Sequence, residues 1–179
     1  MAASLIVVTG PPGAGKTTVA RLLADAFDPS VHLRGDEFWR FIQTGYIAPW
    51  RADSHAQNAV VIDALASAAV AYAVGGYHVV LDGIVGPWYL DRLLARAAAG
   101  QVDVDYVVLR PAQAVAAQRA SGRPGRELAD PGPVAQMYRE FSALGPYETH
   151  VIDSSALTPG ETAEVVRRSL ATGKMRVSS

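Results

Sequence analysis

The sequence has 179 residues, with 17 acidic and 16 basic side chains and no cysteine. Half of the residues are hydrophobic and 18% are charged, which is typical of one globular domain, so we expect a single domain over residues 1–179. The absence of cysteine excludes disulfides and thiolate metal sites, and the near-zero net charge disfavours a non-specific nucleic-acid binder. The first residues carry no signal-peptide pattern, and Asp63 interrupts the longest apolar run, so we expect a cytoplasmic protein without a membrane partner.

Short β-branched runs alternate along the chain with longer segments of helical spacing. We expect strands at 4–10, 31–34, 77–83, 102–110 and 149–155. We expect helices at 17–27, 36–43, 58–76, 87–99, 111–121, 134–144 and 158–171. Loops are expected at 44–58 and 122–133, and a frayed tail at 173–179. This alternation predicts an α/β fold with five parallel strands and helices on both faces of the sheet.

The segment GPPGAGKT at 10–17 matches a phosphate-binding loop at every fixed position, directly after a strand and before a helix. Backbone N–H groups of such a loop, and the N-terminus of the following helix, face the phosphates. We expect Lys16 to reach the β- and γ-phosphates, Thr17 to bind Mg²⁺ and Thr18 to contact the α-phosphate. The predicted nucleotide site therefore comprises Gly10, Pro11, Pro12, Gly13, Ala14, Gly15, Lys16, Thr17 and Thr18.

Two acidic residues follow neighbouring predicted strands, at the edge where ligands of such sheets gather. Asp36 follows the second strand, and a carboxylate there is suited to accept the proton of an attacking hydroxyl. A simple helix cap is the alternative for this residue. Asp82 ends the third strand, and we expect it to hold Mg²⁺ through water or else to contact the acceptor, with a solvated strand end as the alternative.

Three arginines, Arg119, Arg123 and Arg126, lie where a predicted helix passes into a polar loop. Phosphoryl transfer spreads negative charge over the equatorial oxygens, and arginines on a closing loop stabilise that charge and exclude water. We therefore expect a lid over about 120–133. Arg119 and Arg123 flank the junction and are the preferred catalytic residues, while Arg126 is assigned to the acceptor.

Five motifs carry a resemblance that covers essentially the whole chain: GPPGAGKTT (10–18), GDEFW (35–39), VVLDG (79–83), AAQRASGRPGR (116–126) and IDSSALTPGE (152–161). The chain resembles small P-loop kinases of the adenylate-kinase-like group, especially the branch of chloramphenicol phosphotransferase, gluconate kinase and shikimate kinase. The resemblance implies the strand order 2-3-1-4-5. The chain lacks the Gly-Gly-Gly of shikimate kinases and the histidine-rich acceptor pattern of gluconate kinases, so neither substrate is assigned.

The resemblance also implies roles for individual residues. Asp36 matches the acid that positions or deprotonates the acceptor hydroxyl. Arg119 and Arg123 match the lid region, and Arg119 is assigned to the nucleotide as well as to catalysis. The turn after the last strand matches the segment that borders the adenine, which assigns Ser155 and Pro159 to the nucleotide.

Aromatic residues gather in the segments that follow the second and third strands. All three tryptophans, Trp39, Trp50 and Trp88, lie there, and Arg40 adjoins the first of them. These residues are assigned to an acceptor with an apolar or aromatic part, with ordinary packing as the alternative. Polar contacts are also offered by Arg51, His55, Gln57 and Asn58, among which the sequence does not choose. The four histidines show no metal-ligand spacing, so zinc is not expected.

The leading hypothesis is an ATP- and Mg²⁺-dependent kinase that transfers the γ-phosphate to a hydroxyl of a small molecule, such as an antibiotic or another natural product. Within the same class, a zeta-toxin-like kinase acting on a sugar nucleotide and a nucleoside or nucleotide kinase remain open. An RNA or DNA end kinase is disfavoured by the net charge. From a different class, a nucleotide-binding switch without turnover would need neither Asp36 nor the lid arginines. The sequence leaves the oligomeric state open.

Overall fold

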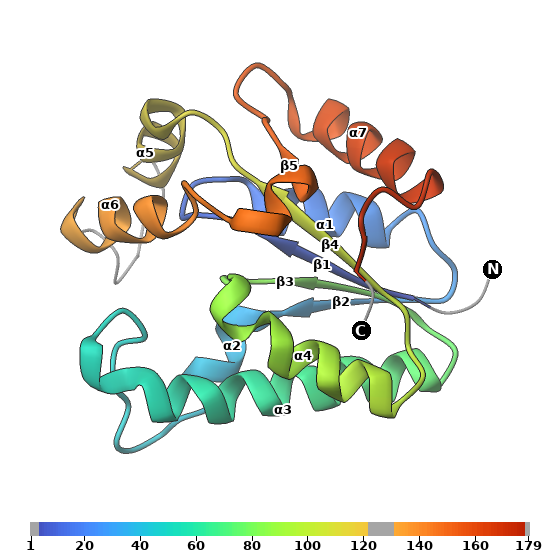
Figure 1. Ribbon diagram of the computed structural model, residues 1–179, viewed down its shortest axis with the longest axis horizontal. Helices are drawn as coiled ribbons and strands as arrows, with labels where there is room; N and C mark the ends of the chain where they lie inside the picture. The colour runs from blue at the N-terminus through green and yellow to red at the C-terminus, as the bar shows by residue number, and fades with distance from the viewer. Residues whose placement is uncertain (1–3, 122–130, 178–179) are drawn as a thin grey trace.

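The computed structural model describes residues 4–121 and 131–177 of the chain. Five strands pair in parallel in the order β2-β3-β1-β4-β5, which confirms the expected fold and strand order (Figure 1). These strands are β1 (Leu5–Thr9), β2 (Ser30–Arg34), β3 (His78–Asp82), β4 (Val104–Leu109) and β5 (Val151–Ile152). The helices are α1 (Lys16–Ala24), α2 (Gly35–Arg40), α3 (His55–Val74), α4 (Pro87–Ala99), α5 (Gln113–Ser121), α6 (Pro131–Glu140) and α7 (Pro159–Ala171), and two 3-10 turns are η1 (Ala52–Ser54) and η2 (Gly145–His150).

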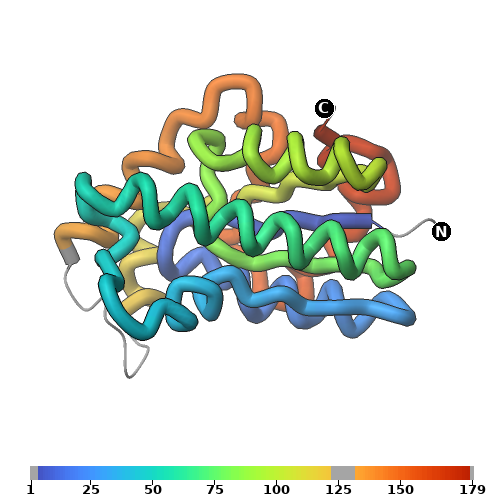
Figure 2. Tube along the Cα trace, turned by 90° about the horizontal axis from the view of Figure 1, so that it is seen from below, coloured from blue at the N-terminus to red at the C-terminus, as the bar shows by residue number. Residues whose placement is uncertain are grey.

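Helices cover both faces of the sheet. Helices α3 and α4 lie side by side on one face, which Figure 2 views directly, and α1 and α7 lie on the other (Figures 1 and 2). Strand β1 serves both layers because successive side chains of a strand point to opposite faces. Leu5 and Val7 pack in the core beneath α3 and α4, whereas Ile6 and Val8 pack in the core beneath α1 and α7. Such two-sided burial explains the continuous apolar run of this strand.

Several element boundaries differ from the sequence-based expectation. Helix α3 begins at His55 rather than at 58, and α6 begins at Pro131 rather than at 134. The expected strand at 149–155 is reduced to Val151–Ile152, because the preceding residues form η2. Apolar periodicity locates an element, but its ends depend on local turns and tertiary contacts.

The expectation of a frayed tail is wrong for the part of the tail that the structure describes. A sixth strand, β6 (Arg176–Val177), pairs antiparallel with β4. Met175 is fully buried, and its carbonyl oxygen accepts a hydrogen bond of 2.8 Å from the backbone N–H of Tyr106. Arg176 forms ion pairs with Asp103 and Asp105. Burial of Met175 and these charge pairs hold the segment against the sheet.

One segment, Ala52–Val74, is long and apolar enough to cross a membrane by length and composition alone, and half of its most apolar window is buried. It consists of η1 and α3. Its buried side chains, including Ile62 and Leu65, belong to the core between α3, α4 and the sheet. We therefore interpret α3 as a core helix.

Candidate active site

The phosphate-binding loop connects β1 to α1 and lies tightly against neighbouring backbone. Gly10 and Gly13 have positive φ angles of 138° and 80°, which favour glycine. A Cβ atom at Gly10 would lie 2.1 Å from the carbonyl oxygen of Leu109, and one at Gly13 would lie 2.0 Å from that of Ala116. The loop therefore fits between the end of β4 and α5 only because these residues carry no side chain.

Lys16 and the first turn of α1 complete the loop. The Lys16 ammonium donates hydrogen bonds to the carbonyl oxygens of Gly10, at 3.0 Å, and Pro11, at 3.1 Å. These bonds fold the side chain back over the loop instead of leaving it extended into solvent. The helix begins at Lys16, so the N-terminal end of its dipole points at the position where phosphates bind in such loops.

Asp82 and Thr17, the two residues that the sequence assigns to Mg²⁺, meet beneath the loop. Asp82 is buried, and it accepts a hydrogen bond of 2.5 Å from the Thr17 hydroxyl and one of 3.0 Å from Nε2 of His32. Burial by itself raises the pKa of Asp82, but the hydrogen bonds from His32 and Thr17 and the positive charge of Lys16 outweigh it and lower the pKa. The carboxylate is therefore ionised, and a hydroxyl and a carboxylate are the oxygen ligands that Mg²⁺ prefers.

Asp36 lies on α2, at the same edge of the sheet. Gly35 is buried so close to β3 that a Cβ atom there would lie 2.8 Å from the carbonyl oxygen of Asp82, which brings the starts of the segments after β2 and β3 together. The N-cap of α2 is Arg34, and no side-chain hydrogen bond caps this helix. Asp36 is thus not the cap that the alternative interpretation required. Its exposed carboxylate lines a cavity together with Lys16 and Thr17.

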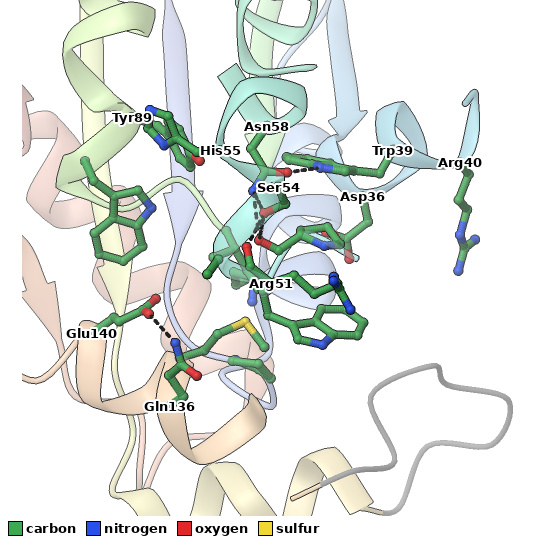
Figure 3. A pocket seen from close by; sticks show the side chains of 18 of the residues that line it. Asp36, Trp39, Arg40, Arg51, Ser54, His55, Asn58, Tyr89, Gln136 and Glu140 are labelled. Atoms are coloured by element: carbon green, nitrogen blue, oxygen red, sulfur yellow. Dashed lines mark hydrogen bonds between the residues drawn. The ribbon is translucent and has the colours of Figure 1, made fainter. Parts of the chain in front are cut away.

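That cavity has a volume of about 580 Å³ and extends from the phosphate-binding loop to α6 (Figure 3). The other walls come from α2, the segment before α3, the start of α3 and the start of α4. The predicted acceptor residues Trp39, Arg40, Trp50 and Trp88 all line it. Asp82 does not line it but lies buried, with its carboxylate against Thr17 and His32.

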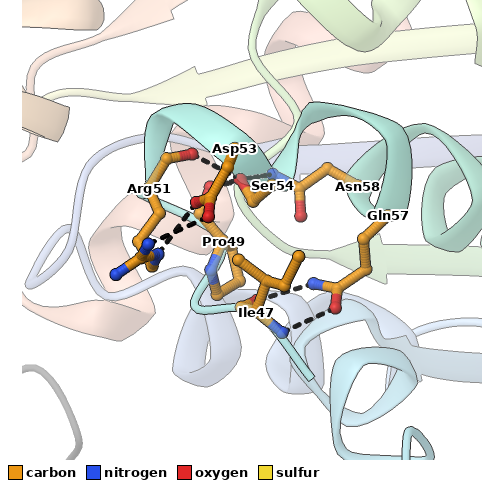
Figure 4. Close-up of polar contacts among 7 residues, drawn as sticks. All are labelled: Ile47, Pro49, Arg51, Asp53, Ser54, Gln57 and Asn58. Carbon is orange, nitrogen blue, oxygen red and sulfur yellow. Dashed lines mark hydrogen bonds and ion pairs between the residues drawn. The ribbon is translucent and has the colours of Figure 1, made fainter. Parts of the chain in front are cut away.

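Polar side chains fix the wall formed by residues 46–54 (Figure 4). The side-chain amide of Gln57 binds both the backbone N–H and the carbonyl oxygen of Ile47, at 2.8 and 2.6 Å. Asn58 donates to the carbonyl oxygen of Pro49 at 2.8 Å and accepts a hydrogen bond of 2.8 Å from Nε1 of Trp39. Gln57, which the sequence offered as a polar contact for an acceptor, therefore braces the wall and does not line the cavity.

Helix α6 supplies the part of the cavity wall that sequence reasoning missed. Gln136, Met137 and Glu140 line the cavity, and Figure 3 shows Gln136 and Glu140 on the side opposite Asp36. The sequence shows that these three residues lie within one turn of a helix. It does not show that this side of the helix faces the cavity. The end of α6 is held by Arg110, which donates to the carbonyl oxygen of Phe141 at 2.9 Å.

The residues assigned to the nucleotide base lie between α5 and α7. A guanidinium nitrogen of Arg119 donates to the carbonyl oxygen of Ser154 at 3.4 Å. The Ser155 hydroxyl accepts a hydrogen bond of 2.7 Å from the backbone N–H of Ala112, and Pro159 is the first residue of α7. The structure thus brings the expected Arg119 to the expected turn. Arg123 and Arg126, and most of the expected lid, lie outside the described residues.

Solved structures of several kinases and a resistance protein share this fold. A sugar kinase from a Janibacter species is 23% identical, with a TM-score of 0.71 and coverage of 94% of this chain and 95% of that chain. A tunicamycin resistance protein from Deinococcus radiodurans is 17% identical, with a TM-score of 0.70 and coverage of 99% of both chains. A gluconokinase from Sinorhizobium meliloti is 22% identical, with a TM-score of 0.60 and coverage of 95% of this chain and 90% of that chain.

These similarities establish the fold of P-loop kinases. No match is found among curated proteins. The family model of chloramphenicol phosphotransferase-like proteins, in contrast, matches residues 3–171, which is nearly the whole chain. The protein therefore belongs to the chloramphenicol phosphotransferase-like family.

Proposed function

We propose that the protein is an ATP-dependent phosphotransferase that acts in the cytoplasm and transfers the γ-phosphate to a hydroxyl group of a small molecule, such as an antibiotic or another natural product. The observation that carries this proposal is a single cavity. The phosphate-binding loop lines it with Lys16 and Thr17, and Asp36, which does not cap its helix, lines it together with three tryptophans. A phosphate donor and an organic acceptor would meet in such a cavity.

In the proposed reaction, Asp36 accepts the proton of the acceptor hydroxyl while the hydroxyl oxygen bonds to the γ-phosphorus and the bond to the β-phosphate oxygen breaks. ADP is the leaving group. Lys16 stabilises the negative charge on the β- and γ-phosphates, and Arg119, with Arg123, would stabilise the charge on the equatorial oxygens. Thr17 and, through water, Asp82 would hold Mg²⁺, which neutralises phosphate charge when bound.

The second candidate is a kinase that acts on a sugar nucleotide. Arg40 and Arg51 line the cavity, and arginine is the preferred partner of phosphate groups. A nucleotide switch without turnover is disfavoured, because an exposed acid between the phosphate-binding loop and an aromatic cavity has no role in it. The two kinase candidates differ in the acceptor, because a sugar nucleotide carries the negative charge of its phosphates.

The test is ADP release from Mg-ATP with a panel of hydroxylated acceptors that includes phenicols, aminoglycosides, sugar acids, nucleosides and UDP-sugars. Asp36→Asn should lower the acceptor-dependent rate by about 10²- to 10⁴-fold, because the variant removes the proton acceptor. ATP binding, measured by calorimetry, should stay unchanged. Asp91→Asn, which alters an exposed acid on α4 that does not line the cavity, is the matched control. Wild-type turnover in Asp36→Asn would show that Asp36 is not the base. If no acceptor increased ADP release, the result would favour a nucleotide-binding switch without turnover.

A further inference from the structure

Glu140 places a carboxylate in the aromatic cavity. This residue is exposed, lies in the last turn of α6 and lines the cavity opposite Asp36 (Figure 3). Its partner is the side-chain amide of Gln136, one turn earlier, at 3.3 Å. Within residues 4–121 and 131–177, none of the ion pairs involves Glu140. A carboxylate in this state keeps most of its capacity to accept hydrogen bonds.

The two arginines of the cavity wall are already paired with acids that do not line it. Arg51 donates to both carboxylate oxygens of Asp53, at 2.8 and 2.9 Å. Arg40 donates to Glu37 at 3.1 Å. The Arg51–Asp53 pair is close to neutral, whereas Glu37 is shared by Arg40 and Arg34, which pairs with it at 3.2 Å. Both cavity arginines are thus engaged by acids outside the cavity. The carboxylate of Glu140 then sets the charge at the end of the cavity far from Asp36.

An aromatic ring lines the same cavity as this carboxylate. Trp88 packs edge-on against Phe141, at 5.4 Å between ring centroids, and Phe141 is the residue that follows Glu140. Trp88 and Glu140 both line the cavity, and Trp88 keeps 44% of its surface exposed. An indole face with a carboxylate nearby is a favourable environment for an ammonium group, because the ring quadrupole and the negative charge attract the same cation.

We propose that the acceptor is an amino alcohol, whose hydroxyl lies at Asp36 and whose protonated amine is bound by Glu140 beside Trp88. This assignment rests on the proposed kinase function and narrows its substrate class. It excludes acceptors whose far end carries a phosphate or carboxylate, which includes sugar nucleotides and sugar acids. Glu140 is the residue that sets this specificity.

The test uses binding without nucleotide, so its outcome does not depend on turnover. All three tryptophans of the chain line the cavity, so intrinsic tryptophan fluorescence reports its occupancy directly. The probes are 2-amino-1-phenylethanol, 1-phenylethane-1,2-diol and mandelic acid, whose two polar groups sit on adjacent carbons, so they test recognition by Glu140 and not the span to Asp36. They share a phenyl ring and a secondary hydroxyl and differ only in carrying an amine, a hydroxyl or a carboxylate. We expect the amine to bind about tenfold more tightly than the diol, and mandelate to bind most weakly.

Variants of Glu140 separate charge recognition from simple apolar binding. Glu140→Gln should bring the amine and the diol to within roughly threefold of each other and leave diol binding unchanged. Glu140→Lys should reverse the order in favour of mandelate. Glu164→Gln, an exposed acid on α7, should behave as wild type. Equal binding of amine and diol by wild type, an unchanged preference in Glu140→Gln, or no quenching by the amine would each overturn the assignment. None of these outcomes bears on ADP release, which tests the kinase itself.

Discussion

The contact between His32 and Asp82 shows what sequence reasoning reaches at the scale of single residues. Asp82 was predictable because it ends an apolar strand, and Lys16 because its motif has fixed spacing. His32 was not, because a lone histidine in a strand carries no pattern. Strand register decides its role: Arg34 pairs with Asp82, and His32, two residues earlier, points to the same face. Nothing in the sequence gives that register, since the two residues lie 50 positions apart.

We expect His32 to position the metal side of the site through Asp82. His32→Ala removes the Nε2 donor that orients the carboxylate and should weaken ATP binding by about tenfold in the presence of Mg²⁺. Binding of ATP in EDTA should be unchanged, because the metal no longer contributes. Calorimetric titration with and without Mg²⁺ measures both values. An equal loss under the two conditions would indicate a merely structural role.

Gly13 tests the packing of the phosphate-binding loop. Gly13→Ala puts a methyl group 2.0 Å from the carbonyl oxygen of Ala116, at a φ of 80°, and should lower the free energy of unfolding by about 1–3 kcal/mol. It should also weaken nucleotide binding, since the loop must move. Gly160→Ala is the matched control, because nothing lies within 4 Å of its added methyl group, and its effect should stay within about 0.5 kcal/mol. Similar urea midpoints for the two variants would contradict this account.

At the scale of elements, apolar periodicity predicted the helices and the four longest strands. It did not predict how the segments that follow β4 pack against the rest of the fold. Apolar spacing indicates that a helix exists, and the facing of α6 depends on distant contacts. Arg110, at the end of β4, binds Glu148 in η2 and the backbone of Phe141 after α6. One guanidinium thus connects the end of β4 to the end of α6 and to η2, both of which lie more than 30 positions later in the sequence. This connection sets where Glu140 lies.

Acid should loosen this connection. Hydrogen bonds from Arg110, and from the backbone of Leu144, lower the pKa of Glu148 from an ordinary 4.5 to about 2. A lowered pKa in the folded state means that the stabilisation is complete above about pH 4.5 and is lost as the pH falls towards 2. Glu148→Gln should therefore melt below wild type at pH 7, and the difference should shrink between pH 4.5 and pH 2. Glu164→Gln is the control, and a gap in melting temperature that is constant with pH would refute the role of this carboxylate.

At the scale of the whole molecule, the alternation of strands and helices predicted the α/β class, and the family resemblance supplied the strand order. The cavity was harder to predict, because its walls come from five separate parts of the chain. The tryptophans were recognised because they cluster in two segments, whereas Met137 and Glu140 belong to a helix that returns to the cavity only in three dimensions. A pattern within one segment cannot indicate such a return.

Nucleotide binding should stabilise the whole fold, because the phosphate-binding loop packs against both β4 and α5. At a Mg-ATP concentration of about 100 times Kd, binding contributes about 2.7 kcal/mol to the free energy of unfolding. For a chain of this length, the melting temperature should then rise by roughly 5–10 °C. Lys16→Ala should abolish most of the rise, because it removes the charge that faces the β- and γ-phosphates. Differential scanning fluorimetry checks this, and an equal rise in the variant would place the nucleotide elsewhere.

The contact of Gly13 with Ala116 has a mechanical consequence. Backbone touches backbone there with no space for a methyl group, so the first turns of α5 act as a fixed pivot rather than as part of a moving arm. Any closing movement of Arg119 towards the phosphates must then bend the chain beyond Ala116. Hydrogen exchange should show this at Ala116, whose amide donates to the carbonyl oxygen of Ala112 at 3.0 Å and should exchange more slowly than the amides that follow it in α5.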